Sequence, residues 1–164
     1  MNSLNIREKG VLSNNVKERL ITLIGIRQAR VGFQFIFNDP GEECASCKQR
    51  SVCLDSLEVG RVYRITRLRE RSFPCKIHAD GVSVVEVVES DVYAAIPKNQ
   101  AFEGATFTFK ILDCDETNCK MRQICFPLGI FEGEKCKILK VDKNFSCPKD
   151  FPLVKALLQR MKYV

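Results

Sequence analysis

The residues of this chain that are best suited to bind a metal are two groups of cysteines. "ECASCKQRSVC", residues 43–53, holds three of them, and "CDETNCKMRQIC", residues 114–125, holds three more. In both groups a fourth cysteine follows downstream, next to a proline, at the same distance from the third. Only the first gap differs, C-x2-C in one group and C-x4-C in the other. The candidate ligands are Cys44, Cys47, Cys53 and Cys75 in the first set and Cys114, Cys119, Cys125 and Cys147 in the second.

The spacing within each set favours an iron–sulfur cluster over a single ion. Thiolates are soft ligands that select zinc, copper(I) or iron–sulfur. Zinc ribbons usually present two short C-x2-C pairs, whereas three close cysteines and a remote fourth supply the wider span of a four-iron cluster. We therefore predict two [4Fe–4S] clusters, serving electron transfer to a redox partner protein or a redox-responsive role in a larger assembly. The alternative is two Zn²⁺ ions, which four thiolates would hold as closed, structural sites.

Other residues near the cysteines have weaker claims. The pairs Lys48/Arg50 and Lys120/Arg122 recur between the cysteines of both sets, where cations would favour thiolates and raise a cluster's potential. Cys136 lies at strand spacing without a counterpart, so we expect a small, partly buried strand residue. No phosphate-binding glycine loop, serine nucleophile or carboxylate pair stands out, so the sequence does not predict an enzyme.

The cysteine sets belong to an internal duplication. An offset of 72 residues, which takes Ile24 to Ile96, also matches Gly32 with Gly104 and both cysteine sets, with small local slips. The chain is therefore expected to contain an N-terminal extension (1–19), a first repeat (20–91) and a second repeat (92–164), the repeats forming one compact unit. Repeats this small need a metal or each other for stability.

Hydrophobic patterning predicts a predominantly β fold of the α+β class, with the two halves related by a pseudo-twofold axis and a metal site in each. Strands are expected at 21–26, 32–38, 61–68 and 81–89, and at 92–97, 105–111 and 135–141. Alternation puts Phe107, Phe109 and Ile111 on one face. The last segment, 152–161, fits either a strand or a helix, because its apolar residues also recur at helical spacing.

Composition points to a cytoplasmic protein. No apolar run approaches the roughly 20 residues that a membrane-spanning helix needs, and the first residues do not resemble a signal peptide. In a reducing compartment, nine cysteines indicate metal or redox chemistry more than disulfides. The formal charge of +6 treats every thiol as neutral, so it is weak support for a polyanion partner.

One segment still makes RNA a candidate partner. "GRVYRITRLRERSFPCK" interleaves cations with aromatic residues, a combination that can hold phosphates and stack bases. A solvated hairpin is the plainer interpretation. The candidate contact residues are Arg61, Arg64, Arg67, Arg69, Arg71 and Lys76.

The chain from about residue 20 to its end resembles the archaeal uncharacterised protein family 0179. The resemblance is carried by "ITLIGIRQARVGFQFIF", "ECASCKQRSVC", "GRVYRITRLRERSFPCKIH" and "AAIPKNQAFEGATFTF". It implies an archaeal, cytoplasmic protein with iron–sulfur redox centres on the two cysteine sets, and all eight cysteines are present. It implies no substrate.

Overall fold

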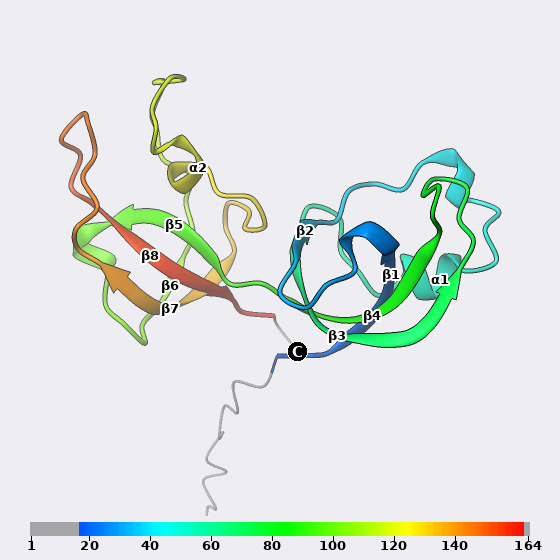
Figure 1. Cartoon of the computed structure of the whole chain (residues 1–164). Coiled ribbons are helices and arrows are strands. Elements are labelled where there is room, and N and C mark those ends of the chain that lie inside the picture. Colours follow the sequence, from blue (N-terminus) through cyan, green and yellow to red (C-terminus); the bar gives the residue numbers. More distant parts are fainter. Residues whose placement is uncertain (1–16, 163–164) are drawn as a thin grey trace, which may run out of the picture.

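The computed structural model describes residues 17–162, so most of the predicted N-terminal extension lies outside the described residues. Within them the chain forms two four-stranded antiparallel sheets, one per repeat, placed side by side (Figure 1). The fold is predominantly β, and its helical pieces are single turns.

The first half builds its sheet in the order β1-β4-β3-β2. Its strands are β1 (Leu20–Gly25), β2 (Gln34–Ile36), β3 (Val62–Phe73) and β4 (Val82–Glu89). The short helices are η1 (Ile26–Gln28), η2 (Glu42–Cys44) and α1 (Arg50–Cys53).

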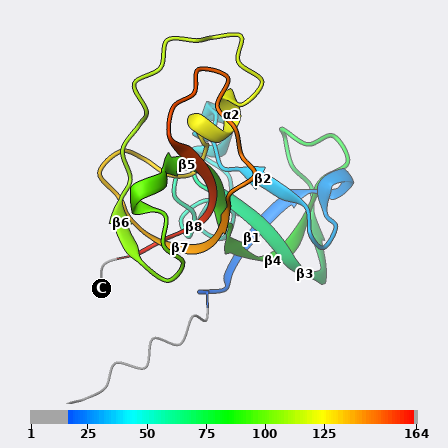
Figure 2. The same cartoon turned by 90° about the vertical axis from the view of Figure 1, so that its left-hand side faces the viewer.

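The second half repeats this topology in the order β5-β8-β7-β6, and Figure 2 shows it from its own side. Its strands are β5 (Val92–Pro97), β6 (Thr106–Thr108), β7 (Lys135–Asp142) and β8 (Leu153–Arg160). Its short helices are η3 (Lys98–Gln100) and α2 (Arg122–Cys125). The cysteine-bearing loops and turns are thus attached to equivalent strands in both halves.

The final segment is a strand, which excludes its helical alternative. Val154, Ala156 and Leu158 alternate into the core of the second half, and β8 pairs with both β5 and β7. Two ladders of hydrogen bonds and a buried face outweigh the helical preference of alanine and leucine.

The expected apolar face of residues 105–111 is only partly correct. Phe107 and Phe109 pack on the core, but Ile111 is 49% exposed. The reason is that β6 ends at Thr108, after which the chain leaves the sheet toward the cysteine loop.

The ladder registers identify structurally equivalent positions of the two halves. Phe35 pairs with Tyr63 in the first sheet, and Phe107 pairs with Cys136 in the second. Tyr63 in turn pairs with Glu89, and Cys136 pairs with Arg160. Glu89 and Arg160 are therefore equivalent residues of opposite charge.

A second equivalent pair shows the same reversal. Gly60 and Gly133, both with positive φ, precede Arg61 and Glu134. Arg61 binds Glu134 through both terminal guanidinium nitrogens, and Arg160 donates from Nε and Nη2 to the two carboxylate oxygens of Glu89, both at 2.7 Å.

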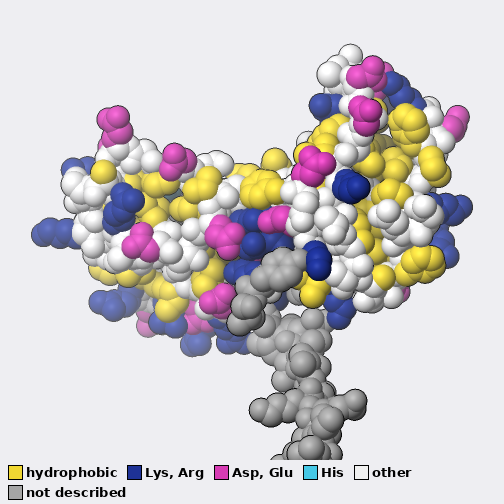
Figure 3. Space-filling view, turned by 180° about the vertical axis from the view of Figure 1, so that it is seen from behind, with side chains coloured by type: hydrophobic (Ala, Val, Ile, Leu, Met, Phe, Trp, Pro, Cys, Tyr) yellow, Lys and Arg dark blue, Asp and Glu magenta, His cyan; other side chains and the backbone are white. Residues whose placement is uncertain are grey.

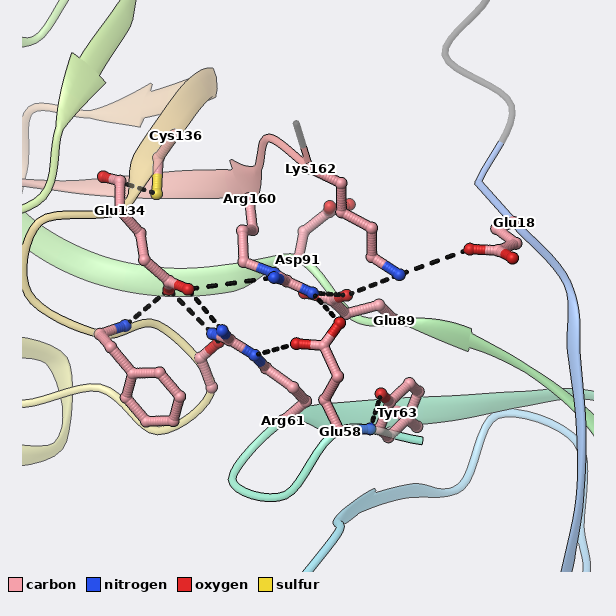
Figure 4. A network of polar contacts seen from close by, with 12 residues as sticks. Glu18, Glu58, Arg61, Tyr63, Glu89, Asp91, Glu134, Cys136, Arg160 and Lys162 are labelled. Atoms are coloured by element: carbon pink, nitrogen blue, oxygen red, sulfur yellow. Dashed lines mark hydrogen bonds and ion pairs between the residues drawn. The ribbon is translucent and has the colours of Figure 1, made fainter. Parts of the chain in front are cut away.

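Each of these ion pairs joins a residue of one half to its own equivalent in the other, as a twofold axis between the halves would arrange it. Figure 4 shows the network, and in Figure 3 dark blue and magenta side chains meet between the halves. Glu58 extends the network by accepting hydrogen bonds from both arginines. In a symmetric dimer the same positions would place like charges opposite each other, so charge reversal makes this junction specific for two different halves.

Arg61 lies in the junction rather than on the surface. Its side chain is 6% exposed, donates to the carbonyl of Gly129 at 3.0 Å and stacks over Phe131, 4.3 Å from the ring centroid. A Cβ on Gly60 would lie 2.6 Å from that ring, so the absence of a side chain at Gly60 lets the two halves approach.

The junction is expected to weaken in acid. Burial alone would raise the pKa of Glu58 and Glu134, but hydrogen bonds from Arg160 and Arg61 hold both below the usual 4.5. A carboxylate with a depressed folded-state pKa stabilises the protein above its unfolded value, and this stability is lost as the pH falls through the folded-state pKa.

The test compares wild type with Glu134→Gln by urea unfolding. The difference in unfolding free energy should be largest near pH 7 and shrink below about pH 4.5. The variant leaves the cysteines intact, so any effect of acid on them is the same in both proteins. A difference independent of pH would contradict the role assigned to Glu134.

Candidate metal centres

The first cysteine set gathers beside the free edge of β1. Cys44 ends η2, Cys47 lies in the following loop, Cys53 ends α1, and Cys75 follows β3. Burial, together with the neighbouring thiols of Cys44, Cys75 and Cys47, raises the pKa of Cys53 from 9.0 to about 11. The fold thus brings all four predicted ligands within electrostatic reach of one another. A cation would remove the repulsion that the neighbouring thiols exert on an ionised Cys53.

The position of Cys53 follows from β1 being an edge strand. The carbonyl groups on the outer edge of β1 have no neighbouring strand to accept hydrogen bonds from. The turn of α1 lies against this edge, where Cys53 Sγ is 3.9 Å from the carbonyl oxygen of Leu23. Thr22 Oγ1 donates to the carbonyl of Cys53 at 2.7 Å, and Ser56 Oγ donates to that of Ile21 at 2.9 Å. These bonds attach the cysteine-bearing turn to the rigid sheet.

The second set is arranged in the same way beside β5. Burial comes first in raising the pKa of Cys125, followed by Cys119, Cys147 and Cys114, while Arg122 acts in the opposite direction. All four cysteines line one cavity of about 690 Å³. Apolar side chains form much of its remaining wall, namely Leu112, Met121, Phe126, Phe151 and Leu153.

Polar groups around this cavity favour thiolates. The backbone N–H of Met121 donates to Cys119 Sγ at 3.4 Å. Arg122 donates to the carbonyl of Glu116 at 3.1 Å and lies over Phe126, 4.4 Å from the ring centroid. These contacts hold the guanidinium near Cys125, where it offsets part of the rise in the thiol pKa that burial and the neighbouring cysteines cause. Such N–H and cationic neighbours stabilise the charge of a metal–thiolate site.

A single-ion site is not preassembled in the described residues. Between residues 17 and 162, no group of three or more His, Cys, Asp or Glu side chains is close enough to hold one metal ion as the side chains stand. In this part of the chain the cysteines of each set lie near one another without forming a metal-binding group, and their assignment as ligands stays a prediction.

The other cysteine and the histidine lie apart from these roles. Cys136 is a strand residue as expected, but it is fully buried in the core of the second half, and burial raises its pKa to about 11. His78 lies against the backbone of Gly25, beside a smaller hollow of about 270 Å³ that includes Arg27 and Asp80.

The arginine-rich strand divides into two kinds of residue. Arg61 belongs to the junction, and Arg69 binds the buried Glu86 from Nε and Nη2 at 3.0 and 2.9 Å. Arg67 lies 3.9 Å from the same carboxylate. Arg64, Arg71 and Lys76 are exposed. RNA binding by this segment stays a prediction. Fewer of its cations are free of carboxylate partners than the sequence implied.

Sequence reasoning missed the junction, although a signal was present: once Gly60 is aligned with Gly133, arginine follows one glycine and glutamate the other. It also missed a lysine-lined hollow on the second sheet. The sequence shows Lys140 and Lys143 as part of a basic segment, but Tyr93 and Lys155 join them only through the pairing of β5, β7 and β8.

Comparison with known proteins identifies a family. The profile of an uncharacterised protein family, UPF0179, matches residues 20–158. The chain belongs to the UPF0179 family. UPF0179 proteins of Methanothermobacter thermautotrophicus and Methanocaldococcus jannaschii are 39% and 40% identical to it, covering 85% and 87% of this chain and 97% and 95% of theirs.

A UPF0179 protein of Pyrococcus abyssi is 34% identical over 86% of this chain and 99% of its own. These relatives are archaeal, and their names state no activity, ligand or partner. No solved structure matches the chain. No helix among residues 17–162 is long and apolar enough to cross a membrane.

Proposed function

We propose that this UPF0179 protein carries two [4Fe–4S] clusters, one on each set of four cysteines. The observation that carries the proposal is the cavity of about 690 Å³ lined by Cys114, Cys119, Cys125 and Cys147. A zinc ion needs four sulfurs at about 2.3 Å from one centre, whereas a cubane spreads its four ligands over a wider span. The room between these cysteines fits the second requirement better.

The residues around the cavity suit such a group. The N–H of Met121 and the guanidinium of Arg122 offset the negative charge of a thiolate-bound cluster, and the apolar wall limits water at the sulfurs. When bound, the cluster supplies one-electron oxidation and reduction. The chain supplies a rigid anchor, because the third ligand of each set ends a turn packed on an edge strand.

This arrangement supports electron transfer to a redox partner protein, or a redox-responsive role within a larger assembly. The two sites belong to separate sheets on either side of the junction (Figure 1), so each can be exposed to its own partner surface. The residues assign no catalytic role beyond electron exchange.

Anaerobic purification with metal and sulfide analysis tests the proposal. We expect a brown protein with about eight irons and eight acid-labile sulfides per chain, as two four-iron clusters require. A colourless protein with about two zinc ions would replace the clusters by structural zinc sites. Electron paramagnetic resonance after dithionite reduction supplies a second readout, since it detects a reduced cluster without an activity assay.

A further inference from the structure

A hollow on the outer face of the second sheet lies apart from both cysteine sets. It has a volume of about 480 Å³. Tyr93 on β5 lines it from the face opposite the buried Ala94, and Tyr93 is 47% exposed. The lining residues are Tyr93, Lys140, Val141, Asp142, Lys143, Asn144 and Lys155.

The three lysines of this hollow are not neutralised. Among residues 17–162, no carboxylate lies within ion-pair distance of Lys140, Lys143 or Lys155, whereas Lys17, Lys149 and Lys162 each have one. Lys155 Nζ instead lies 4.5 Å from the centroid of the Tyr93 ring. An aromatic face orients an ammonium group without cancelling its charge, so Lys155 remains able to bind an anion.

The one acidic residue in the wall has another contact. Asp142 Oδ1 accepts a hydrogen bond from the backbone N–H of Asn144 at 3.0 Å, which shapes the turn that carries Lys143. The hollow therefore combines three positive charges, one negative charge and an exposed aromatic ring within the volume range of small-molecule sites, about 300–1,000 Å³.

We propose that this hollow binds a nucleotide, with the base stacked on Tyr93 and the phosphates held by Lys140, Lys143 and Lys155. Aromatic rings flanked by cations on an exposed sheet face bind nucleotides because every base has a π-face and every phosphate is an anion. The ligand is a free nucleotide or one nucleotide of a single strand; both present the same base and phosphate. The proposal is independent of the metal centres.

The first half lacks this combination, which makes it an internal comparison. The ladder registers place Ile21, Arg67 and Val84 at the positions of Tyr93, Lys140 and Lys155. There is no ring, and Arg67 has Glu86 at 3.9 Å. The site is therefore particular to the second half and is not a repeated feature of the fold.

Calorimetric titration of the intact, metal-loaded protein tests the proposal, with adenosine triphosphate, inorganic triphosphate and a uridine 12-mer as probes. Tyr93→Ala should weaken nucleotide binding at least about ten-fold, whereas Tyr93→Phe, which keeps the ring, should stay within about two-fold. Lys140→Gln should weaken binding and lower the salt dependence by about one phosphate contact. Lys98→Gln, an exposed lysine outside the hollow, is the matched control and should bind as wild type.

The outcomes separate the ligand sources and the alternatives. Equal affinity for the nucleotide and the 12-mer identifies a free nucleotide, and much tighter binding of the 12-mer identifies a single strand; both support the site. The proposal is overturned if no probe binds, if inorganic triphosphate binds as tightly as the nucleotide, or if Tyr93→Ala binds as wild type. Circular dichroism of each variant confirms that it is folded.

Discussion

Replacing Cys125 by serine is expected to remove the metal from the second half and leave the first half loaded. Cys125 is the buried member of its set and anchors α2 beside β5, so serine removes both a soft ligand and the best-fixed one. Iron and sulfide content should fall to about half of the wild-type value, as expected for one cluster instead of two. Cys53→Ser should produce the complementary loss in the first half.

The same substitution should destabilise the second half locally. Metal binding contributes directly to folding free energy, on the order of 10 kcal/mol for structural zinc sites in small domains. Hydrogen exchange read by mass spectrometry should therefore accelerate in residues 92–162 of Cys125→Ser and in residues 20–91 of Cys53→Ser.

Cys136→Ala is the matched control for this experiment. Cys136 is a fully buried cysteine of the same half, but it packs in the core rather than beside the cavity. It should keep full metal content and lose only about 1 kcal/mol of stability, as for a small core truncation. Full metal in Cys125→Ser, or loss of metal in Cys136→Ala, would refute the ligand assignment.

Removing the Arg61 side chain should cause a large loss of stability although it leaves the hydrophobic core of each half intact. Arg61→Ala deletes a guanidinium that contacts Glu134, Glu58 and the carbonyl of Gly129, and leaves the partly buried Glu134 without its main partner. Breaking a buried ion pair in this way costs about 3–5 kcal/mol. Because Glu134 is about one-fifth exposed, we expect the lower end of that range in urea unfolding at neutral pH.

A double-mutant cycle distinguishes a true pair from two independent losses. Arg61→Ala combined with Glu134→Ala should cost less than the sum of the single variants by at least about 1 kcal/mol. Arg27→Ala, which breaks the exposed pair with Asp80, is the control and should change stability by less than about 1 kcal/mol. Strict additivity of Arg61 and Glu134 would show that the contact between the halves does not hold them together.

The sequence predicted most strands correctly. It failed for residues whose role depends on contacts with residues distant in the sequence. Apolar runs and alternating apolar residues predicted seven of the strands, because both patterns record which side chains are buried. β8 was ambiguous, since alanine and leucine also favour helices and only pairing with β5 and β7 decides between the two. Arg61 looked like part of a basic surface, because nothing near it in sequence shows that Glu134 lies opposite.

The linear chain was enough to establish the duplication, the two sets of four cysteines and a predominantly β fold. All of these are recorded by residue type and local spacing. Only the tertiary structure decided which cations form ion pairs with carboxylates and which lysines beside Tyr93 do not. Only the tertiary structure showed that all four cysteines of the second set line one cavity. These properties depend on side chains brought together from distant strands, and their distances are set by packing rather than by sequence spacing.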